Sequence, residues 1–533
     1  MLDIEKTIKS MSLDEKIGQL FMIGINGPEI DGGAIEMLEK YHAGGVILFA
    51  RNIKTAEQVK KLTGELKRRA KYPLSVSIDQ EGGLVLRLTS GATVLPGNMA
   101  LSACRPETYD KFCSGWGKIT ADELRHLGFT LNLAPVLDIN NIKNPGIGAR
   151  SFSDQPNLCS SLGEKIIGSV QSNGLSACAK HFPGKGNASV DAHLDLPVID
   201  STIDQLRNFE LLPFKRAIEA GVDAIMTAHV VYRGIAGETL PATLSYRVLT
   251  TLLKDELGFS GPLITDDMEM GAIKNYYEQR EACFRSFMAG ADIILICHTK
   301  ELQINAMQYF KEKYINGELP DERLNDALER IYRMKSRAVN YKDEFKTIDY
   351  KKNSEFAQEL SDNSITLVSD SVGVIEKIAK RDFNDIVLIE PRFSAITQVE
   401  DIEEKSPLFE LLKTGFAGIN ITHEIYDVKI NNEQINMILS KIGGDRLKKS
   451  LLISITYNAH IFTQQTKLIN SLINDSRIAV CAAVRNPYDL ALIDGKASKI
   501  ATYGFRQCNM KSIAKLILSE ISSQGTLPVS LTS

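Results

Sequence analysis

The first 340 residues alternate short apolar runs with longer amphipathic stretches, and this alternation limits the possible folds more than any other feature of the sequence. The short runs are rich in Val, Ile and Leu and are too short to be helices. Continuous apolar strands separated by helices are typical of a parallel sheet that is covered on both faces. Eight such units in this length predict a (β/α)8 TIM barrel. The expected strands are 18–25, 44–50, 73–79, 130–139, 176–182, 224–231, 261–266 and 291–297. Between them, 53–69 and 202–220 have the apolar spacing of helices.

A second α/β pattern begins at about residue 363, as expected for a chain of 533 residues, which is too long for one ordinary core. Its expected strands are 385–390, 451–457, 478–484 and 500–503, with helices such as 431–442 and 510–521. We therefore expect a catalytic barrel domain over 1–340, a charge-dense helical linker over 341–362 and a smaller α/β sandwich domain over 363–533. Few polar residues cluster at the strand ends of the second domain, so we expect it to play a supporting role.

Composition excludes several classes of partner. Apolar residues make up 44% of the chain and charged residues 24%, and the net charge is only -4. These values are typical of a globular protein with no electrostatic footprint for nucleic acid or an anionic membrane. No apolar stretch is long enough to span a bilayer, and the charged N-terminus is not a signal peptide, although a leader removed earlier would leave no trace. The eight cysteines are scattered singly, which favours reduced buried thiols and a cytoplasmic location.

Ionisable residues follow almost every expected barrel strand. In a TIM barrel the carboxyl ends of the strands carry the active site, and packing alone does not explain repeated charges at these positions. The residues are Asp79, Asp138, Lys180, His181, His229, Asp266 and His298.

Asp266 is the best candidate for a carboxylate nucleophile. It ends the apolar segment LIT and is expected to point into the barrel mouth. Cleavage of a glycoside with retention needs such a carboxylate beside the anomeric carbon. The alternative is a helix N-cap, a common place for Asp. Position alone does not decide between the two.

The loop after the fifth strand supplies a candidate proton donor. It contains KHFPGKG and then DAHLDLP, and its glycines and prolines exclude regular structure. Asp191 and His193 are two residues apart, so in an extended segment they point to the same side. The carboxylate would then favour the protonated imidazole, which can exchange a proton near neutral pH. The alternative is a surface pair without a role.

Five further residues are candidates for binding sugar hydroxyl groups, because they offer carboxylate, guanidinium, ammonium or imidazole groups at the same end of the barrel. Any one of them alone could instead belong to a structural ion pair. They are Asp79, Arg87, Arg150, Lys180 and His181.

Other chemistries have weaker support. His181, His193, His229 and His298 could in principle bind zinc, but the sequence has no HExxH motif and no closely spaced Cys/His set. It also lacks a P-loop and a GxSxG elbow. We therefore expect neither a metal site nor a cofactor.

These segments together resemble family 3 of the glycoside hydrolases, in particular the two-domain branch of the NagZ-type β-N-acetylglucosaminidases. The resemblance covers nearly the whole chain. Its motifs are SLDEKIGQLF, IDQEGG, LNLAPVLDI, GARSFS, KHFPGKG, DAHLDLP, MTAHV and ITDDMEM, with RNPYDL and GTLPVSL in the second domain.

The resemblance implies a role for each candidate. Asp266 matches the family's nucleophile, and Asp191 with His193 matches the Asp-His dyad that serves as acid and base in this subfamily. The positions that bind the sugar are matched by Asp79, Arg87, Arg150, Lys180 and His181.

The activity implied by the resemblance is a retaining exo-β-N-acetylglucosaminidase that needs no cofactor. Its substrate would be terminal β-linked N-acetylglucosamine, for example in the cell-wall muropeptides of peptidoglycan recycling. The open alternatives are a phosphorylase of such glycosides, a β-glucosidase or β-xylosidase of the family, and a non-catalytic sugar-binding protein. Leu84, Lys185 and Ala192 stand where the motifs usually have Arg, His and Ser. These departures leave the fine geometry of the loop and the preference beyond the first sugar undecided.

Overall fold

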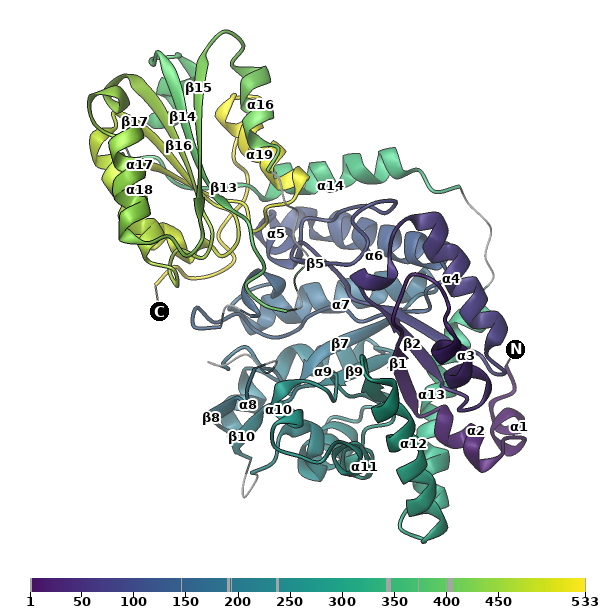
Figure 1. Cartoon of the computed structure of the whole chain (residues 1–533). Helices are drawn as coiled ribbons and strands as arrows, with labels where there is room; N and C mark the ends of the chain where they lie inside the picture. The colour runs from purple at the N-terminus through teal and green to yellow at the C-terminus, as the bar shows by residue number, and fades with distance from the viewer. Residues whose placement is uncertain are drawn as a thin grey trace.

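The computed structural model of the chain describes residues 2–144, 146–188, 192, 194–235, 239–341, 347–371, 373–398, 400 and 406–532. Its two main parts each contain a largely parallel sheet with helices packed on it. Figure 1 shows the barrel below and the smaller sheet above it, with α14 (Tyr350–Ser364) running between the two parts.

Within the described residues, eight parallel strands form one sheet in the order β11-β9-β7-β6-β3-β2-β1-β12. A parallel bridge between Ile264 and Ile293 links its two edges, so the barrel is nearly closed. This confirms the expected TIM-like fold. The strands are β1 (Phe21–Gly24), β2 (Gly45–Leu48), β3 (Ser75–Ile78), β6 (Leu131–Asn132), β7 (Ser176–Phe182), β9 (Ala224–Thr227), β11 (Leu263–Ile264) and β12 (Ile294–Ile296).

The helices around the barrel form because their apolar residues recur on one face. In α4, Val59, Leu62 and Leu66 are buried at helical spacing. The Thr55 side chain caps this helix by accepting a hydrogen bond from the Gln58 N–H. The surrounding helices are α3 (Gly32–Glu39), α4 (Ala56–Arg69), α6 (Tyr109–His126), α7 (Pro156–Ser172), α9 (Leu212–Glu219), η5 (Arg247–Glu256), α11 (Gln279–Ala289), α12 (Lys300–Ile315) and α13 (Asp321–Asn340).

Several expected elements are shorter than the sequence pattern or are divided. The segment 202–220 forms two helices, α8 (Ile203–Asn208) and α9, because Pro213 favours the start of a helix and cannot continue one. The segment 224–231 is also divided, since the ladder of β9 ends at Thr227 and a separate strand β10 (Val231–Gly234) pairs with β8 (Val198–Thr202).

The second part contains a six-stranded sheet in the order β13-β18-β17-β16-β14-β15, in which β13 alone runs antiparallel to its neighbour. In Figure 1, α17 (Asn432–Ile442) and α18 (Gln464–Asp475) lie on one face, and α16 (Leu408–Gly415) and α19 (Gln507–Ile517) lie on the other. The strands are β13 (Thr366–Ser369), β14 (Asp385–Arg392), β15 (Asn420–Asp427), β16 (Ser450–Thr456), β17 (Ile478–Ala483) and β18 (Ser498–Ala501).

The two edge strands, β13 and β15, were missing from the expectation. In β15 only Tyr426 is buried, so the strand lacks the apolar run of its neighbours. The division of the chain at residues 340 and 363 stays a prediction. The eight cysteines are all buried free thiols, as expected. In the part of the chain that the structure describes, no helix combines the length and the apolar character needed to cross a membrane.

The carboxyl ends of both sheets face each other. The Tyr488 hydroxyl, beyond β17, donates to Asn140 Oδ1 at 2.6 Å, and Asn140 lies in the loop after β6. The fully buried Arg506, beyond β18, donates from Nε to the Gly83 carbonyl at 2.7 Å, near the end of β3. The loops of the second part therefore lie over the end of the barrel where its active site is expected.

Lys335 on α13 is a lysine buried in the barrel domain, and its burial can be tested by its effect on stability. Its ammonium is buried, donates to Gln19 Oε1 at 2.8 Å and contacts no carboxylate among the described residues. Burial lowers the pKa of Lys335 to about 7, whereas an unfolded Lys titrates near 10.4. Between these values the unfolded chain binds the extra proton, so the free energy of unfolding rises with pH.

We expect Lys335→Met to remove this rise and to stabilise the protein at pH 7 by about 1 kcal/mol, because a buried charge is replaced by an apolar group. Urea unfolding from pH 7 to 10, followed by the fluorescence of Trp116, the single tryptophan, would measure both effects. The exposed Lys9→Met is the control. A pH slope that survives in Lys335→Met would contradict the prediction.

Candidate active site

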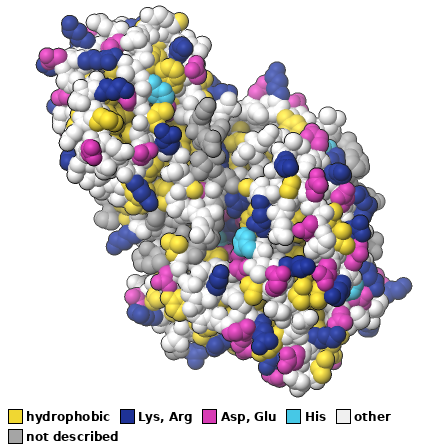
Figure 2. Space-filling model, in the orientation of Figure 1, with side chains coloured by type: hydrophobic (Ala, Val, Ile, Leu, Met, Phe, Trp, Pro, Cys, Tyr) yellow, Lys and Arg dark blue, Asp and Glu magenta, His cyan; other side chains and the backbone are white. Residues whose placement is uncertain are grey.

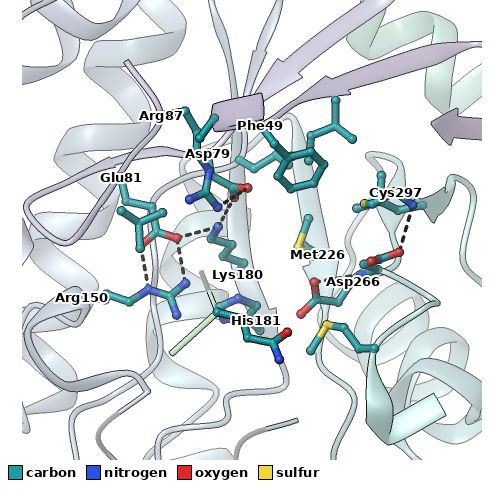
Figure 3. Close-up of a pocket in the computed structure, with 18 of the residues that line it drawn as sticks. Phe49, Asp79, Glu81, Arg87, Arg150, Lys180, His181, Met226, Asp266 and Cys297 are labelled. Carbon is teal, nitrogen blue, oxygen red and sulfur yellow. Dashed lines mark hydrogen bonds and ion pairs between the residues drawn. The ribbon is translucent and has the colours of Figure 1, made fainter. Parts of the chain in front are cut away.

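A cavity of about 320 Å3 lies at the carboxyl ends of the barrel strands. The sequence-predicted residues that the structure describes all line it: Asp79, Arg87, Arg150, Lys180, His181 and Asp266. Figure 3 shows Asp79, Glu81, Arg150 and Lys180 on one side and Asp266 on the other. The predicted dyad, Asp191 and His193, lies outside the described residues.

A network of paired charges forms one wall of the cavity. Lys180 Nζ lies 2.7 Å from both Asp79 Oδ1 and Glu81 Oε1. Arg150 binds both oxygens of Glu81 at 2.8 Å each. Arg87 Nη2 lies 3.6 Å from Asp79 Oδ2. The network therefore joins side chains from three places in the barrel: the segment 79–87 after β3, the loop after β6, and β7.

The pairing keeps these buried groups charged. Burial opposes the ionisation of Glu81, but the adjacent Arg150 and Lys180 outweigh it and hold the pKa of Glu81 below its usual value. Burial likewise disfavours the ammonium of Lys180, yet Asp79 and Glu81 raise its pKa. Glu81 and Lys180 thus stay charged at neutral pH and offer a sugar a fixed acceptor and a fixed donor.

Two glycines of the IDQEGG motif bring Glu81 into this wall. Gly82 and Gly83 join β4 (Gln80–Gly82) to β5 (Val85–Leu86), with φ values of 92° and 61° that side chains rarely adopt. A Cβ atom at Gly82 would lie 2.7 Å from the ring of Trp116. The close packing of this turn therefore requires glycine.

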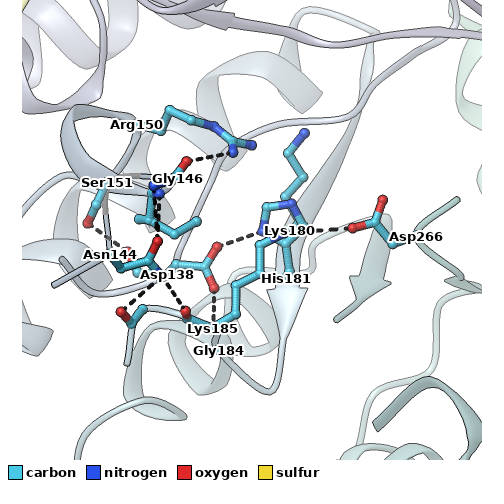
Figure 4. Close-up of polar contacts among 12 residues, drawn as sticks. Asp138, Asn144, Gly146, Arg150, Ser151, Lys180, His181, Gly184, Lys185 and Asp266 are labelled. Carbon is cyan, nitrogen blue, oxygen red and sulfur yellow. Dashed lines mark hydrogen bonds and ion pairs between the residues drawn. The ribbon is translucent and has the colours of Figure 1, made fainter. Parts of the chain in front are cut away.

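His181 is held by Asp138, the residue at the end of the fourth expected strand. Its Nδ1 lies 2.6 Å from Asp138 Oδ2, and Asp138 Oδ1 accepts the Lys185 N–H at 2.7 Å. Burial, reinforced by Lys185, lowers the pKa of His181 well below its usual value. The Asp138 carboxyl group thus fixes the orientation of the imidazole ring. Figure 4 shows the ring between the carboxylates of Asp138 and Asp266.

Asp266 lies two residues beyond β11 and faces the cavity. Its Oδ1 accepts the Asp267 N–H at 2.9 Å, and Lys185 Nζ lies 3.7 Å from its Oδ2. The next helix, α10 (Gly271–Lys274), begins after Met270. Asp266 is therefore not the N-cap of that helix, which removes the structural alternative for this residue.

His229 fixes the peptide backbone at the candidate nucleophile. It is fully buried, and burial lowers its pKa, so the ring is neutral. Its Nε2 lies 2.9 Å from the Asp267 carbonyl oxygen and must donate to it. Its Nδ1 then accepts from the Thr243 hydroxyl at 2.8 Å. On the other side, the Asp266 N–H reaches Thr227 Oγ1 at 3.4 Å.

The sequence predictions left out several lining residues. Glu81 could have been predicted as a site residue, because it lies two residues after Asp79 in the IDQEGG motif. Asp267 also lines the cavity, and its Oδ2 lies 3.4 Å from Nε2 of His298, which the sequence already placed after the eighth strand. The apolar lining residues and Gln398 of the second part lie in no sequence motif that would have identified them. The apolar members are Ile47, Phe49, Ala50, Val85, Leu133, Met226, Met270 and Leu295. Across the described ranges, no three His, Cys, Asp or Glu side chains are grouped to hold a metal.

Carboxylates and their polar partners at the top of a TIM barrel are the arrangement of a barrel enzyme. The model of the glycosyl hydrolase family 3 N-terminal domain matches residues 12–334, which is more than half of the chain. The chain therefore belongs to glycosyl hydrolase family 3.

Among curated proteins, β-hexosaminidase A of Pseudoalteromonas piscicida is 34% identical over 326 residues, 57% of this chain and 54% of that protein. The chain thus matches about half the length of this relative. The β-hexosaminidase of Xylella fastidiosa (strain M23) is 33% identical over 282 residues, 52% of this chain and 83% of that protein.

Solved structures give a longer match. A family 3 β-N-acetylglucosaminidase from Paenibacillus sp. str. FPU-7 is 34% identical with a TM-score of 0.89, covering 98% of this chain and 99% of that chain. Native NagZ from Neisseria gonorrhoeae is 29% identical with a TM-score of 0.56, covering 64% of this chain and 97% of that chain. The two-sheet arrangement is therefore shared with the Paenibacillus enzyme over almost its full length.

We expect Glu81→Gln to destabilise the barrel by about 3 kcal/mol at pH 7. The substitution removes the carboxylate that compensates the buried positive charges of Arg150 and Lys180. The folded pKa of Glu81 is depressed, so its contribution is complete above the unfolded value, about 4.3, and is lost as the pH falls below it. The difference from wild type should therefore shrink at pH 3.5 in urea unfolding. The half-exposed Glu359→Gln, which breaks only a surface pair with Lys111, should change stability little. Equal effects of the two substitutions would contradict the role of the network.

Proposed function

We propose that this protein is a retaining exo-β-N-acetylglucosaminidase that removes terminal β-linked N-acetylglucosamine by double displacement. The observation that carries the proposal is the position of Asp266, a carboxylate held by backbone contacts on one side of a cavity whose opposite wall is built from fixed sugar-binding groups. A carboxylate so placed can attack an anomeric carbon and stabilise the positive charge that develops on the ring.

The relatives support the choice of sugar. The relatives from Pseudoalteromonas piscicida and Xylella fastidiosa are β-hexosaminidases, and the Paenibacillus protein that matches almost the whole chain is a β-N-acetylglucosaminidase. The mixed lining also suits an N-acetylated sugar, because charged groups can bind hydroxyls while Phe49, Met226 and Met270 can contact the acetamido methyl group.

We assign proton transfer to His193, oriented by Asp191. Support comes from the described residue between them: the Ala192 carbonyl accepts the Ala272 N–H at 3.0 Å, and Ala192 packs against Met270, which lines the cavity. The segment after Asp266 thus holds Ala192, the residue between the two proposed groups, close to the cavity.

The proposed reaction has two steps. Asp266 attacks the anomeric carbon, and the C–O bond to the leaving group breaks as protonated His193 gives its proton to the leaving oxygen. Neutral His193 then takes a proton from water, whose oxygen attacks the anomeric carbon and releases the Asp266 carboxylate. Both protons are accounted for, and no cofactor is needed.

The natural substrate and location are part of the same proposal. We place the enzyme in the cytoplasm, where buried free thiols stay reduced, acting on N-acetylglucosaminyl muropeptides or related glycosides.

A panel of aryl glycosides tests this activity. We expect aryl N-acetyl-β-glucosaminide to be cleaved with a kcat/KM at least about a hundredfold above those of the glucoside and xyloside, since a missing acetamido group leaves its binding groups unused. Added phosphate should leave the rate and the free-sugar product unchanged; a sugar phosphate product would show a phosphorylase. Asp266→Asn should lower kcat at least about a thousandfold while binding of N-acetylglucosamine stays within about twofold. No cleavage of any glycoside by wild type would overturn the proposal in favour of a binding protein.

His193→Ala separates the acid role from a structural role. Substrates whose leaving group needs protonation, such as N,N′-diacetylchitobiose, should lose about 10²–10⁴-fold in kcat/KM. An activated nitrophenyl glycoside should lose far less in that parameter, because its leaving group departs as an anion. Equal losses on both substrates would argue against proton donation by His193.

A further inference from the structure

The second part of the chain reaches into the sugar cavity. Of the described residues that line the cavity, Gln398 alone comes after residue 340. It lies between β14 and α16, in a segment that leaves the carboxyl end of the second sheet. This position differs from the supporting role that the sequence predicts for the second domain.

A buried ion pair fixes the segment that carries Gln398. Arg485 Nη1 lies 2.7 Å from Glu400 Oε2, and both side chains are buried. The same carboxylate accepts the Ile396 N–H at 2.9 Å and the Thr397 hydroxyl at 3.0 Å. The backbone on both sides of Gln398 is therefore tied to one anion that cannot move without breaking a buried pair.

The same segment lies close to the loop that holds Arg150, because Thr397 Cγ2 is 3.8 Å from the position that a Cβ atom on Gly146 would occupy. The Gly146 carbonyl in turn accepts from Arg150 Nη1 at 3.1 Å. Gln398 therefore lines the cavity from a segment that lies close to the loop of Arg150.

The chemistry of Gln398 suits a sugar contact. Its side chain is exposed to the cavity and has no hydrogen-bond partner among the described residues. A carboxamide offers a donor and an acceptor side by side, which matches neighbouring hydroxyl groups or an acetamido group. It adds no charge to the network of Asp79, Lys180 and Glu81. A cavity of about 320 Å3 is near the lower limit for small-molecule sites, so its walls contact one sugar unit rather than two.

We propose that Gln398 is a specificity-determining residue that hydrogen-bonds the terminal sugar, and that the pair of Glu400 and Arg485 holds it in place. The second sheet then supplies part of the sugar site itself. This inference rests on the proposed glycosidase activity and adds to it the residue through which the second part of the chain recognises the substrate.

Gln398→Ala tests the contact. We expect kcat/KM to fall about tenfold on nitrophenyl N-acetylglucosaminide and by the same factor on N,N′-diacetylchitobiose, because both present the same terminal sugar. The inhibition constant of free N-acetylglucosamine should rise by a similar factor. The thermal midpoint should not change, since the side chain makes no contact that supports the fold. Gln464→Ala, an exposed glutamine on α18 of the same domain, is the matched control and should change none of these values.

The outcomes separate this inference from the proposed activity. If the wild-type protein cleaves no substrate, the proposed glycosidase activity is wrong. If the wild type is active and Gln398→Ala has the same kinetic constants, only the proposed contact of Gln398 with the sugar is wrong. A loss confined to diacetylchitobiose would also overturn it, because Gln398 would then contact the leaving sugar.

The attachment of this segment to Glu400 is tested by combining substitutions. Thr397→Val removes one hydrogen bond to Glu400 without breaking the pair, so the chain should still fold. If Thr397 acts through Gln398, Thr397→Val should weaken binding of N-acetylglucosamine in wild type and have no further effect in Gln398→Ala. Additive losses in the double variant would contradict this positioning role.

Discussion

The pairing of buried charges at the top of the barrel is the constraint on which the site depends. Glu81 would be too costly to bury alone, and so would Lys180 and Arg150, but together they compensate one another. Because the partners come from separate strands and loops, the network can form only when the barrel has closed to the correct geometry. The groups that would bind a sugar are therefore already oriented before a sugar arrives, which lowers the entropy that binding must otherwise overcome.

The two sheets face each other with their carboxyl ends, so contacts between them also help to orient the binding groups before a sugar arrives. Parallel sheets place functional loops at the carboxyl ends of their strands. Here the loops of the second sheet meet those of the barrel, and buried contacts such as Arg506 with Gly83 hold the meeting surface in register. Beyond the carboxyl ends of the second sheet, Arg485 donates to both Glu400 and the Tyr457 hydroxyl, and all three side chains are buried. The strand ends of the second sheet thus help to shape the cavity of the barrel in the same chain.

Much of the barrel and its site could be predicted from sequence, because apolar strands that end in ionisable residues are a local signal. Asp79, Lys180, His181 and Asp266 were found in this way, and all line the cavity. Glu81 was missed because a carboxylate in a turn looks solvent-exposed until its partners, 69 and 99 residues away, are known. Gln398 had no local signal, since its position depends on how two sheets dock. The edge strand β15 was missed because its sequence is largely polar and only Tyr426 in it is buried. The assignment of Asp191 and His193 is still a prediction from sequence.

The complete burial of the cysteines has a practical consequence. Burial raises the pKa of thiols such as Cys104 and Cys113, so they are protonated and shielded at neutral pH. Cys297 borders the cavity yet is itself buried. Alkylating reagents should therefore react with the native chain only when it opens, and the sites modified first would show which sheet separates from its helices before the other.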